Sequence, residues 1–292
     1  MSKAEGAKAL QHFTEQYNKA NTSYNPKLNL SYESGALLAI DQAGLKWSHA
    51  VSPKGNPTFR PLTLKDAQFT VPKQKGWPKS FVADAMSNRR NATTGQPQRW
   101  FLVFSRDSID AQWRAEYFAT FAGNATPKLK KDEDGYAEAV PTGSGSGLTV
   151  NPGKLSRTYA DYLNTGKGEA FAPGPHTDGW RERRAKNANQ VNARLLWQDR
   201  PSDYRPVALR TADGGALVFF STVYHQQKTA AEGLRLNLVP GMRGILDGPA
   251  KKTNRMAFTT VSAQAVKVPA KDTDGKITIL NRIERMTAAK TL

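Results

Sequence analysis

Residues 141–147 read Pro-Thr-Gly-Ser-Gly-Ser-Gly, and this short stretch divides the 292-residue chain into two nearly equal halves. Glycine and serine offer no large side chains to bury, so such a run is typical of a flexible connection between domains. The chain is also longer than one hydrophobic core usually spans. We therefore expect a first domain at 1–140, a Gly/Ser linker at 141–153 and a second domain at 154–292.

Working outward from the linker, the first half shows two helical patterns followed by strand-like segments. Apolar residues recur at helical spacing from residue 4 to 21 and from 30 to 45, with Pro26 between them. Segments rich in aromatic and β-branched residues then alternate with Gly- and Pro-containing turns. The expected strands are residues 59–70, 80–87, 99–105 and 113–121.

The second half repeats this order. Two helices are expected at 155–166 and 177–189, and the turn signal Asp213-Gly214 predicts a hairpin. The expected strands are residues 193–198, 207–211, 216–224, 234–238, 256–268 and 277–283. Helices that precede an antiparallel sheet in each half predict the α+β class.

The composition excludes several classes of protein. There is no cysteine, which rules out disulfides, thiolate nucleophiles and zinc–thiolate or iron–sulfur sites. The longest apolar runs, at 36–40 and 216–220, are far shorter than the roughly 20 residues of a membrane span. The first eight residues are polar and do not resemble a signal peptide, which suggests that an upstream segment has been removed.

The charge is strongly positive and uneven. Lysine and arginine number 42 against 25 acidic residues, and residues 151–292 carry net +11 of the total +17. The densest cluster lies on the helix expected at 177–189, and the binding residues expected there are Trp180, Arg181, Arg183, Arg184 and Lys186. Arginine binds phosphate and carboxylate groups in a bidentate manner, so this cluster predicts a polyanion or partner site. The alternative is a solvated basic helix.

Motifs for catalysis are missing. His12, His49, His176 and His225 have no metal-type or triad-type neighbours, and neither a phosphate loop nor a serine elbow occurs. Asp84 on an expected strand is the best candidate for a buried general base, together with His225. We expect a protein that is not an enzyme, with no catalytic residue, no metal and no cofactor.

Most of the chain, and most clearly residues 5–140, also resembles a group of actinobacterial (Streptomyces-type) cell-envelope proteins. The resemblance rests on residues 9–13, 17–21, 33–35 and 39–41, and on turns and aromatic residues such as 59–62, 76–79 and 134–137. Members of this group are lipoproteins or membrane-anchored proteins of unassigned function. The layout of helices followed by a curved sheet further resembles tandem NTF2/cystatin-like domains.

The resemblance implies an extracytoplasmic, membrane-anchored protein whose anchor lies outside these 292 residues. We expect a non-enzymatic binding or assembly module at the membrane–wall boundary that holds a protein partner or an anionic polymer or membrane surface, and no specific nucleic acid. The alternative is a small-molecule-binding protein or enzyme that uses an NTF2-like cone pocket. The sequence gives no oligomeric state.

Overall fold

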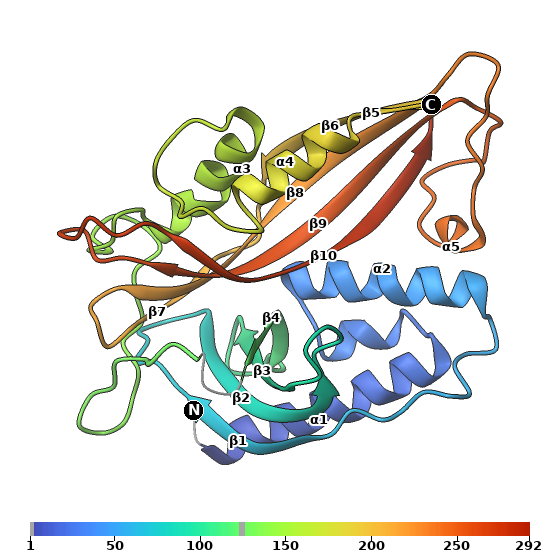
Figure 1. Cartoon of the computed structure of the whole chain (residues 1–292). Coiled ribbons are helices and arrows are strands. Elements are labelled where there is room, and N and C mark those ends of the chain that lie inside the picture. Colours follow the sequence, from blue (N-terminus) through green and yellow to red (C-terminus); the bar gives the residue numbers. More distant parts are fainter. Residues whose placement is uncertain (1–2, 123–125) are drawn as a thin grey trace.

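Residues 3–122 and 126–292 are described in a computed structural model (Figure 1). In the first half, two helices precede a four-stranded antiparallel sheet of order β1-β2-β3-β4. The elements are α1 (Lys3–Ser23), the 3-10 helix η1 (Leu28–Ser31), α2 (Gly35–Val51), β1 (Leu64–Thr70), β2 (Lys79–Arg90), β3 (Pro97–Arg106) and β4 (Arg114–Ala122).

The second half has a larger antiparallel sheet of order β10-β9-β8-β6-β5, and β7 pairs with the start of β8. The α+β class is therefore confirmed. The elements are η2 (Pro152–Lys154), α3 (Leu155–Thr165), α4 (Asp178–Asn187), β5 (Asn189–Gln190), β6 (Ala193–Pro201), β7 (Val207–Arg210), β8 (Ala216–Ala230), α5 (Pro240–Arg243), β9 (Arg255–Val268) and β10 (Thr278–Thr291).

The strand expected at 234–238 is wrong. Its alternating leucines predicted a strand, but this segment lies in the long connection between β8 and β9. Leu236 and Leu238 pack instead beside Met242 in a small apolar cluster that covers the end of α2. The amide of Leu236 donates to the carbonyl of Thr253 at 2.9 Å and that of Leu234 to the carbonyl of Ala231 at 3.1 Å, but these bonds do not extend into a ladder.

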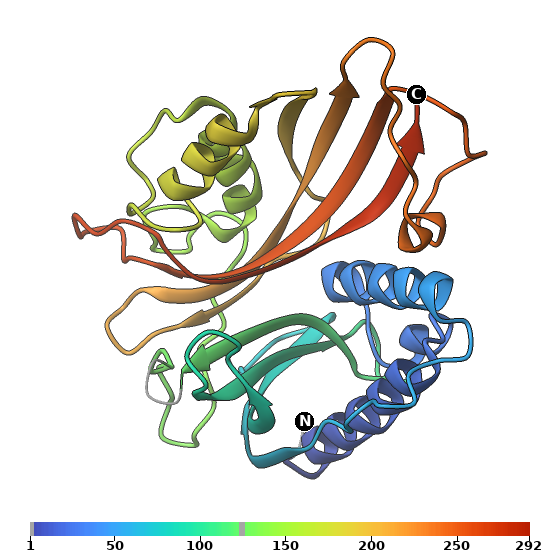
Figure 2. The same ribbon diagram turned by 45° about the vertical axis from the view of Figure 1, so that its right-hand side comes forward.

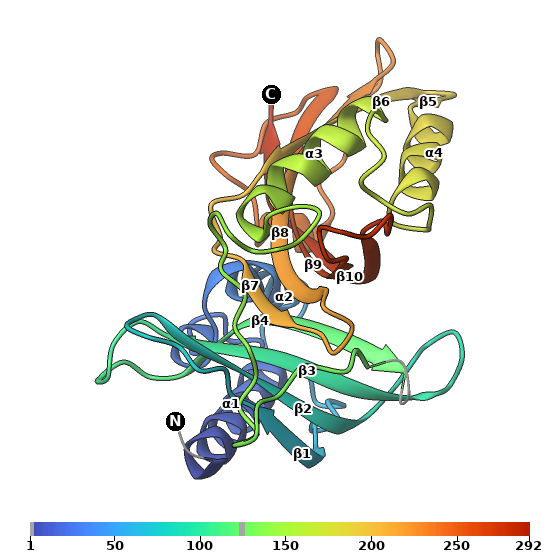
Figure 3. The same cartoon turned by 90° about the vertical axis from the view of Figure 1, so that its left-hand side faces the viewer.

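The two sheets face each other, with α1 on the outer side of the first sheet and α2 between the halves (Figures 1 and 2). Alternation places Phe81, Leu102 and Phe104 against Phe13 of α1. The opposite side of the same strands contributes to a cluster that also contains Phe219 and other apolar residues of the second sheet. Figure 3 shows α3 and α4 on the far side of the second sheet. The main core thus lies between the halves.

Helix α2 lies at the junction and buries two different faces. Leu37 and Leu45 pack into the α1 cluster of the first half. Ala36 and Ile40 join the core between the sheets, and Ala43 packs with residues of α5 and β9. Because helical neighbours lie three or four positions apart, residues 36, 40 and 43 form one stripe and residues 37 and 45 form another.

Residues 141–153, the predicted Gly/Ser linker, make specific contacts with the second half. Leu148 and Ser146 are buried. The amide of Thr149 donates to the carbonyl of Pro269 at 3.0 Å, and that of Lys271 donates to Gly147 at 3.0 Å. The Gly/Ser composition predicted flexibility, but these backbone groups are satisfied by the β9–β10 connection. The division into domains at 1–140 and 154–292, and the kinship with NTF2/cystatin-like domains, stay predictions.

Candidate functional site

Helix α4 carries the predicted basic cluster over the second sheet, but its side chains have different surroundings. The helix begins after Thr177, whose hydroxyl donates to the carbonyl of Ala172 at 2.9 Å. Trp180 and Arg184, one turn apart, are only partly exposed and lie against the sheet side of α4, whereas Arg183 and Lys186 are exposed. The cluster therefore combines a buried layer with an outer, solvent-facing layer.

Arg184, one of the binding residues predicted on α4, is largely buried and points towards the second sheet. Its guanidinium forms a bidentate ion pair with Asp199 of β6, whose side chain is 1% exposed against 12% for Arg184. The amide side chain of Asn164 holds the backbone of Asp199 through two hydrogen bonds of 2.8 Å. The rings of Trp180 and Tyr224 lie 5.3 and 4.7 Å from the guanidinium carbon. Arg184 is thus neutralised and fixed.

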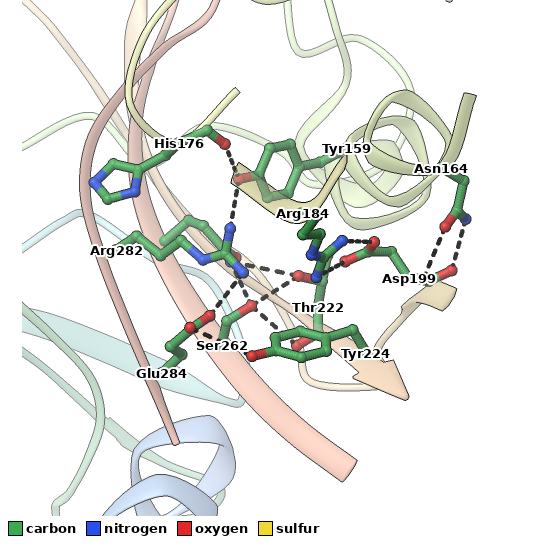
Figure 4. A network of polar contacts seen from close by, with 11 residues as sticks. Tyr159, Asn164, His176, Arg184, Asp199, Thr222, Tyr224, Ser262, Arg282 and Glu284 are labelled. Atoms are coloured by element: carbon green, nitrogen blue, oxygen red, sulfur yellow. Dashed lines mark hydrogen bonds and ion pairs between the residues drawn. The ribbon is translucent and has the colours of Figure 1, made fainter. Parts of the chain in front are cut away.

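A second buried guanidinium, that of Arg282 on β10, lies beneath α4 (Figure 4). Its side chain is 2% exposed; one nitrogen donates to Glu284 at 2.7 Å and another to the hydroxyl of Tyr159 at 3.1 Å. The Arg282 guanidinium carbon also lies 4.1 Å from the ring centre of Trp180. Sequence reasoning missed Arg282, because its partners come from α3 and α4, more than 90 positions away; only the Arg-x-Glu spacing on one strand face hinted at an ion pair.

Buried hydroxyl and amide groups continue this network along β8 and β9. The hydroxyls of Thr222 and Ser262 are 2.9 Å apart, and the amide of Gln264 donates to Ser262 at 2.7 Å. Tyr224 donates to Glu284 at 3.4 Å. We call these residues, together with Arg184, Asp199 and Arg282, the arginine network (Figure 4). Its groups lock the strands and α4 into one arrangement.

A pocket opens beside the arginine network, where α4 faces β6 and β8. Its volume is about 330 Å³. The lining combines aromatic rings, two arginines and three carboxamides: Trp180, Arg183, Arg184, Asn187, Gln190, Leu195, Trp197, Tyr224 and Gln226. We call it the α4 pocket. Of the predicted residues, Trp180, Arg183 and Arg184 meet there.

Arg181 and Lys186 do not line the α4 pocket. The guanidinium of Arg181 lies 5.9 Å from the ring centre of Tyr162, on α3. It fills the space beside Gly166, where a Cβ would overlap it and where the backbone has a positive φ of 70°. Lys186 is exposed on the outer side of α4. The predicted five-residue site is therefore divided between a pocket and a helix surface.

The candidate catalytic residues have structural partners. Asp84 pairs with Arg99 at 2.6 Å beside a cavity of about 430 Å³. Burial raises the pKa of the Asp84 carboxyl, and Arg99 opposes this rise. His225 lies 3.1 Å from the hydroxyl of Thr259, and burial lowers its pKa. Within residues 3–122 and 126–292, no three His, Asp or Glu side chains converge as metal ligands would.

The first half contains a different buried polar group, which sequence reasoning also missed. The carboxyl of Glu33, fully buried after η1, accepts from Asn29 at 2.6 Å, and Asn29 also donates to the hydroxyl of Tyr32 at 3.0 Å. Burial raises the pKa of Glu33 well above its ordinary value, and the nearby charge of Asp41 raises it further. Burial raises the pKa of Asp41 too, although Glu33 and Arg285 oppose this. We call Asn29, Tyr32, Glu33 and Asp41 the acidic network.

Comparison with known proteins places the chain in a family. Residues 1–291 match the family model described as Domain of unknown function (DUF8094), so the chain belongs to this family. It is 41% identical over 293 residues to an uncharacterized lipoprotein of Streptomyces coelicolor, and equally to one of Streptomyces avermitilis. Each alignment covers 99% of this chain and 85% of the relative. A second Streptomyces coelicolor lipoprotein is 22% identical over 287 residues, with 95% and 79% covered.

No solved structure matches the chain significantly. The relatives are named as lipoproteins, which are proteins held at a membrane by a lipid, and this confirms the predicted resemblance to Streptomyces-type lipoproteins. In the part of the chain that the structure describes, no helix is both long and apolar enough to span a bilayer.

Proposed function

We propose that this protein is a non-enzymatic binding module outside the cytoplasm, at the membrane–wall boundary, and that it holds an anionic cell-envelope polymer. The observation that carries the proposal is the α4 pocket. Its lining offers cationic and carboxamide groups that bind ligands, but no nucleophile next to a base. The lipoprotein names of the relatives support the location.

The charge of the second half supports an anionic ligand. This half carries net +11 from 23 basic and 12 acidic residues, against +6 for residues 1–150. Long-range attraction by such a field raises the local concentration of a polyanion. Arg184 does not contribute a free charge, because Asp199 neutralises it. The exposed cations of α4, Arg183 and Lys186, are therefore the ones available to the polymer.

The arginine network gives these exposed residues a rigid base. Arg184 and Arg282 fix the sheet side of α4 through Asp199, Tyr159 and Glu284. A fixed helix presents Arg183 without an ordering cost at the moment of binding, which favours affinity. This arrangement suits a binding surface that does not change shape.

The test is a binding titration of the full chain with fluorescein-labelled poly(glycerol phosphate) at two salt concentrations. The variant Arg183→Gln/Lys186→Gln should weaken Kd roughly tenfold, which corresponds to about 1.4 kcal/mol. Binding by the wild type should weaken as salt is raised, because screening shortens to about 8 Å at physiological ionic strength.

The matched control is Lys54→Gln/Lys65→Gln, which removes the same charge from two exposed positions of the first half. It should change Kd little. If both double variants weaken binding equally, the polymer responds to total charge and not to α4. If the wild type does not bind poly(glycerol phosphate) or any other polyanion, the proposal is wrong.

A further inference from the structure

The α4 pocket has features that net charge alone does not require. A site for a dense polyanion needs cations along its surface, but this pocket also holds an aromatic ring and carboxamides beside one free guanidinium. We propose that the α4 pocket binds a sugar ring that carries a carboxylate or phosphate substituent. This inference rests on the proposed function and names the chemical class of the polymer.

Trp197 supplies the ring that a sugar can stack on. It lies on β6 and is partly exposed, and its nearest cationic partner is Arg184 at 5.9 Å from the ring centre. The other indole in the pocket is occupied, because Arg282 lies 4.1 Å and Arg183 lies 5.1 Å from the ring centre of Trp180. The electron-rich indole face attracts positively polarised edges, such as the C–H groups of a pyranose.

The carboxamides distinguish a sugar from a bare phosphate chain. Within the described residues, the side chains of Gln190 and Gln226 make no hydrogen bond, although both line the pocket. Each carboxamide has two donors and an acceptor oxygen. A phosphate diester offers acceptors only, so the carboxamide oxygens would find no donor on it. Sugar hydroxyls both donate and accept, and satisfy both ends of each carboxamide.

Arg183 supplies one positive charge at the edge of this pocket. One of its terminal nitrogens donates to the carbonyl of Pro175 at 2.6 Å, which leaves its other N–H groups for a ligand. Since Asp199 neutralises Arg184, the lining presents a single free cation. That balance fits one anionic group per bound sugar. The volume of about 330 Å³ is also within the range of small-ligand pockets, about 300–1,000 Å³.

The experiment measures the affinity of the full chain for three oligomers by calorimetric titration. They are a hyaluronate hexasaccharide, which carries carboxylates on sugar rings, the neutral chitohexaose, and a linear polyphosphate matched in charge to hyaluronate. We expect hyaluronate to bind at least tenfold more tightly than either of the others. Trp197→Ala should remove this preference, Trp197→Phe should retain most of it, and Gln226→Leu should reduce it.

Leu196→Ala is the matched control, because Leu196 precedes Trp197 on β6, is 48% exposed and points to the opposite side of the sheet. It should leave all three affinities unchanged. Equal binding of hyaluronate and polyphosphate, or an unchanged preference in both Trp197→Ala and Gln226→Leu, overturns the sugar site while the proposed polymer binding stands. Failure of every polyanion to bind overturns both.

Discussion

Both halves bury polar side chains where a helix meets a sheet, but the acidic network and the arginine network solve the problem differently. In the first half, Glu33 and Asp41 lie close together, and burial raises the pKa of both, so they are best accommodated with a shared proton. In the second half, Arg184 and Arg282 are charged, and the carboxylates of Asp199 and Glu284 compensate these charges.

The two networks differ in how a buried group responds when its partner is removed. A carboxyl group becomes neutral by binding a proton, whereas a guanidinium stays charged at any pH that a folded protein survives. The acidic network therefore adapts to a missing partner, and the arginine network does not. The arginine network lies under the α4 pocket, and its permanent charges and their partners hold α4 in a fixed position beside that pocket.

The largest expected effect comes from removing a carboxylate of the arginine network. Asp199→Asn leaves the guanidinium of Arg184 buried without a counter-charge, and we expect the free energy of unfolding in urea to fall by about 3 kcal/mol. The control Asp203→Asn removes an exposed carboxylate from the same half and should cost less than 0.5 kcal/mol, a roughly neutral surface change. Similar losses for the two variants would mean that the ion pair is not a stabilising element.

A pair of hydroxyl deletions compares the two networks directly. Tyr159→Phe removes the acceptor of a charged N–H of Arg282 together with the donor to the carbonyl of His176, and Tyr32→Phe removes the acceptor of a neutral amide of Asn29. Hydrogen bonds to charged groups contribute more, so we expect losses of about 2 and about 1 kcal/mol in the free energy of unfolding. Equal losses in urea titrations would contradict the distinction between the networks.

A further expected effect is a pH dependence of stability from the acidic network. Folded Glu33 retains its proton above its ordinary pKa of 4.5, while the unfolded chain releases it. The unfolded state then binds fewer protons, so the free energy of unfolding falls as pH rises from 4.5 towards the raised pKa, by up to about 1.4 kcal/mol per pH unit. Glu33→Gln should flatten this slope.

Exposed Glu133→Gln serves as the control and should keep the wild-type slope. Melting temperatures measured between pH 4.5 and 8 report the difference. A wild-type stability that instead rises through this window would show that Glu33 is ionised in the folded protein.

Much of the fold could be predicted because it follows local patterns. The apolar spacing of α1 and the aromatic strands β2 to β4 gave their positions to within a few residues. The second half of β8, with Gln226, Gln227 and Lys228, has no apolar alternation, so the predicted strand stopped six residues early at Tyr224. Those residues form a strand because β6 and β9 pair with both edges.

The candidate site could be predicted only in part, because sequence patterns report local features and not contacts between distant elements. The basic cluster is contiguous in sequence and was found, but the inward direction of Arg184 depends on Asp199, 15 positions away on another element. Arg282 is 123 positions from Tyr159. Such pairings arise from the packing of α4 on the sheet, and composition carries no signal of them.

Because helix α2 buries two faces, it has a consequence for how the chain folds during synthesis. A ribosome adds about 5–20 residues per second, so the second sheet follows the first half by roughly 10–30 s. During that interval Ala36, Ile40 and Ala43 are covered only in part, by strands of the first half such as β4, since the rest of their cover comes from β9, β10 and α5. The nascent first half therefore exposes a temporary apolar stripe that a chaperone can hold, and maturation ends only when the C-terminal strands arrive.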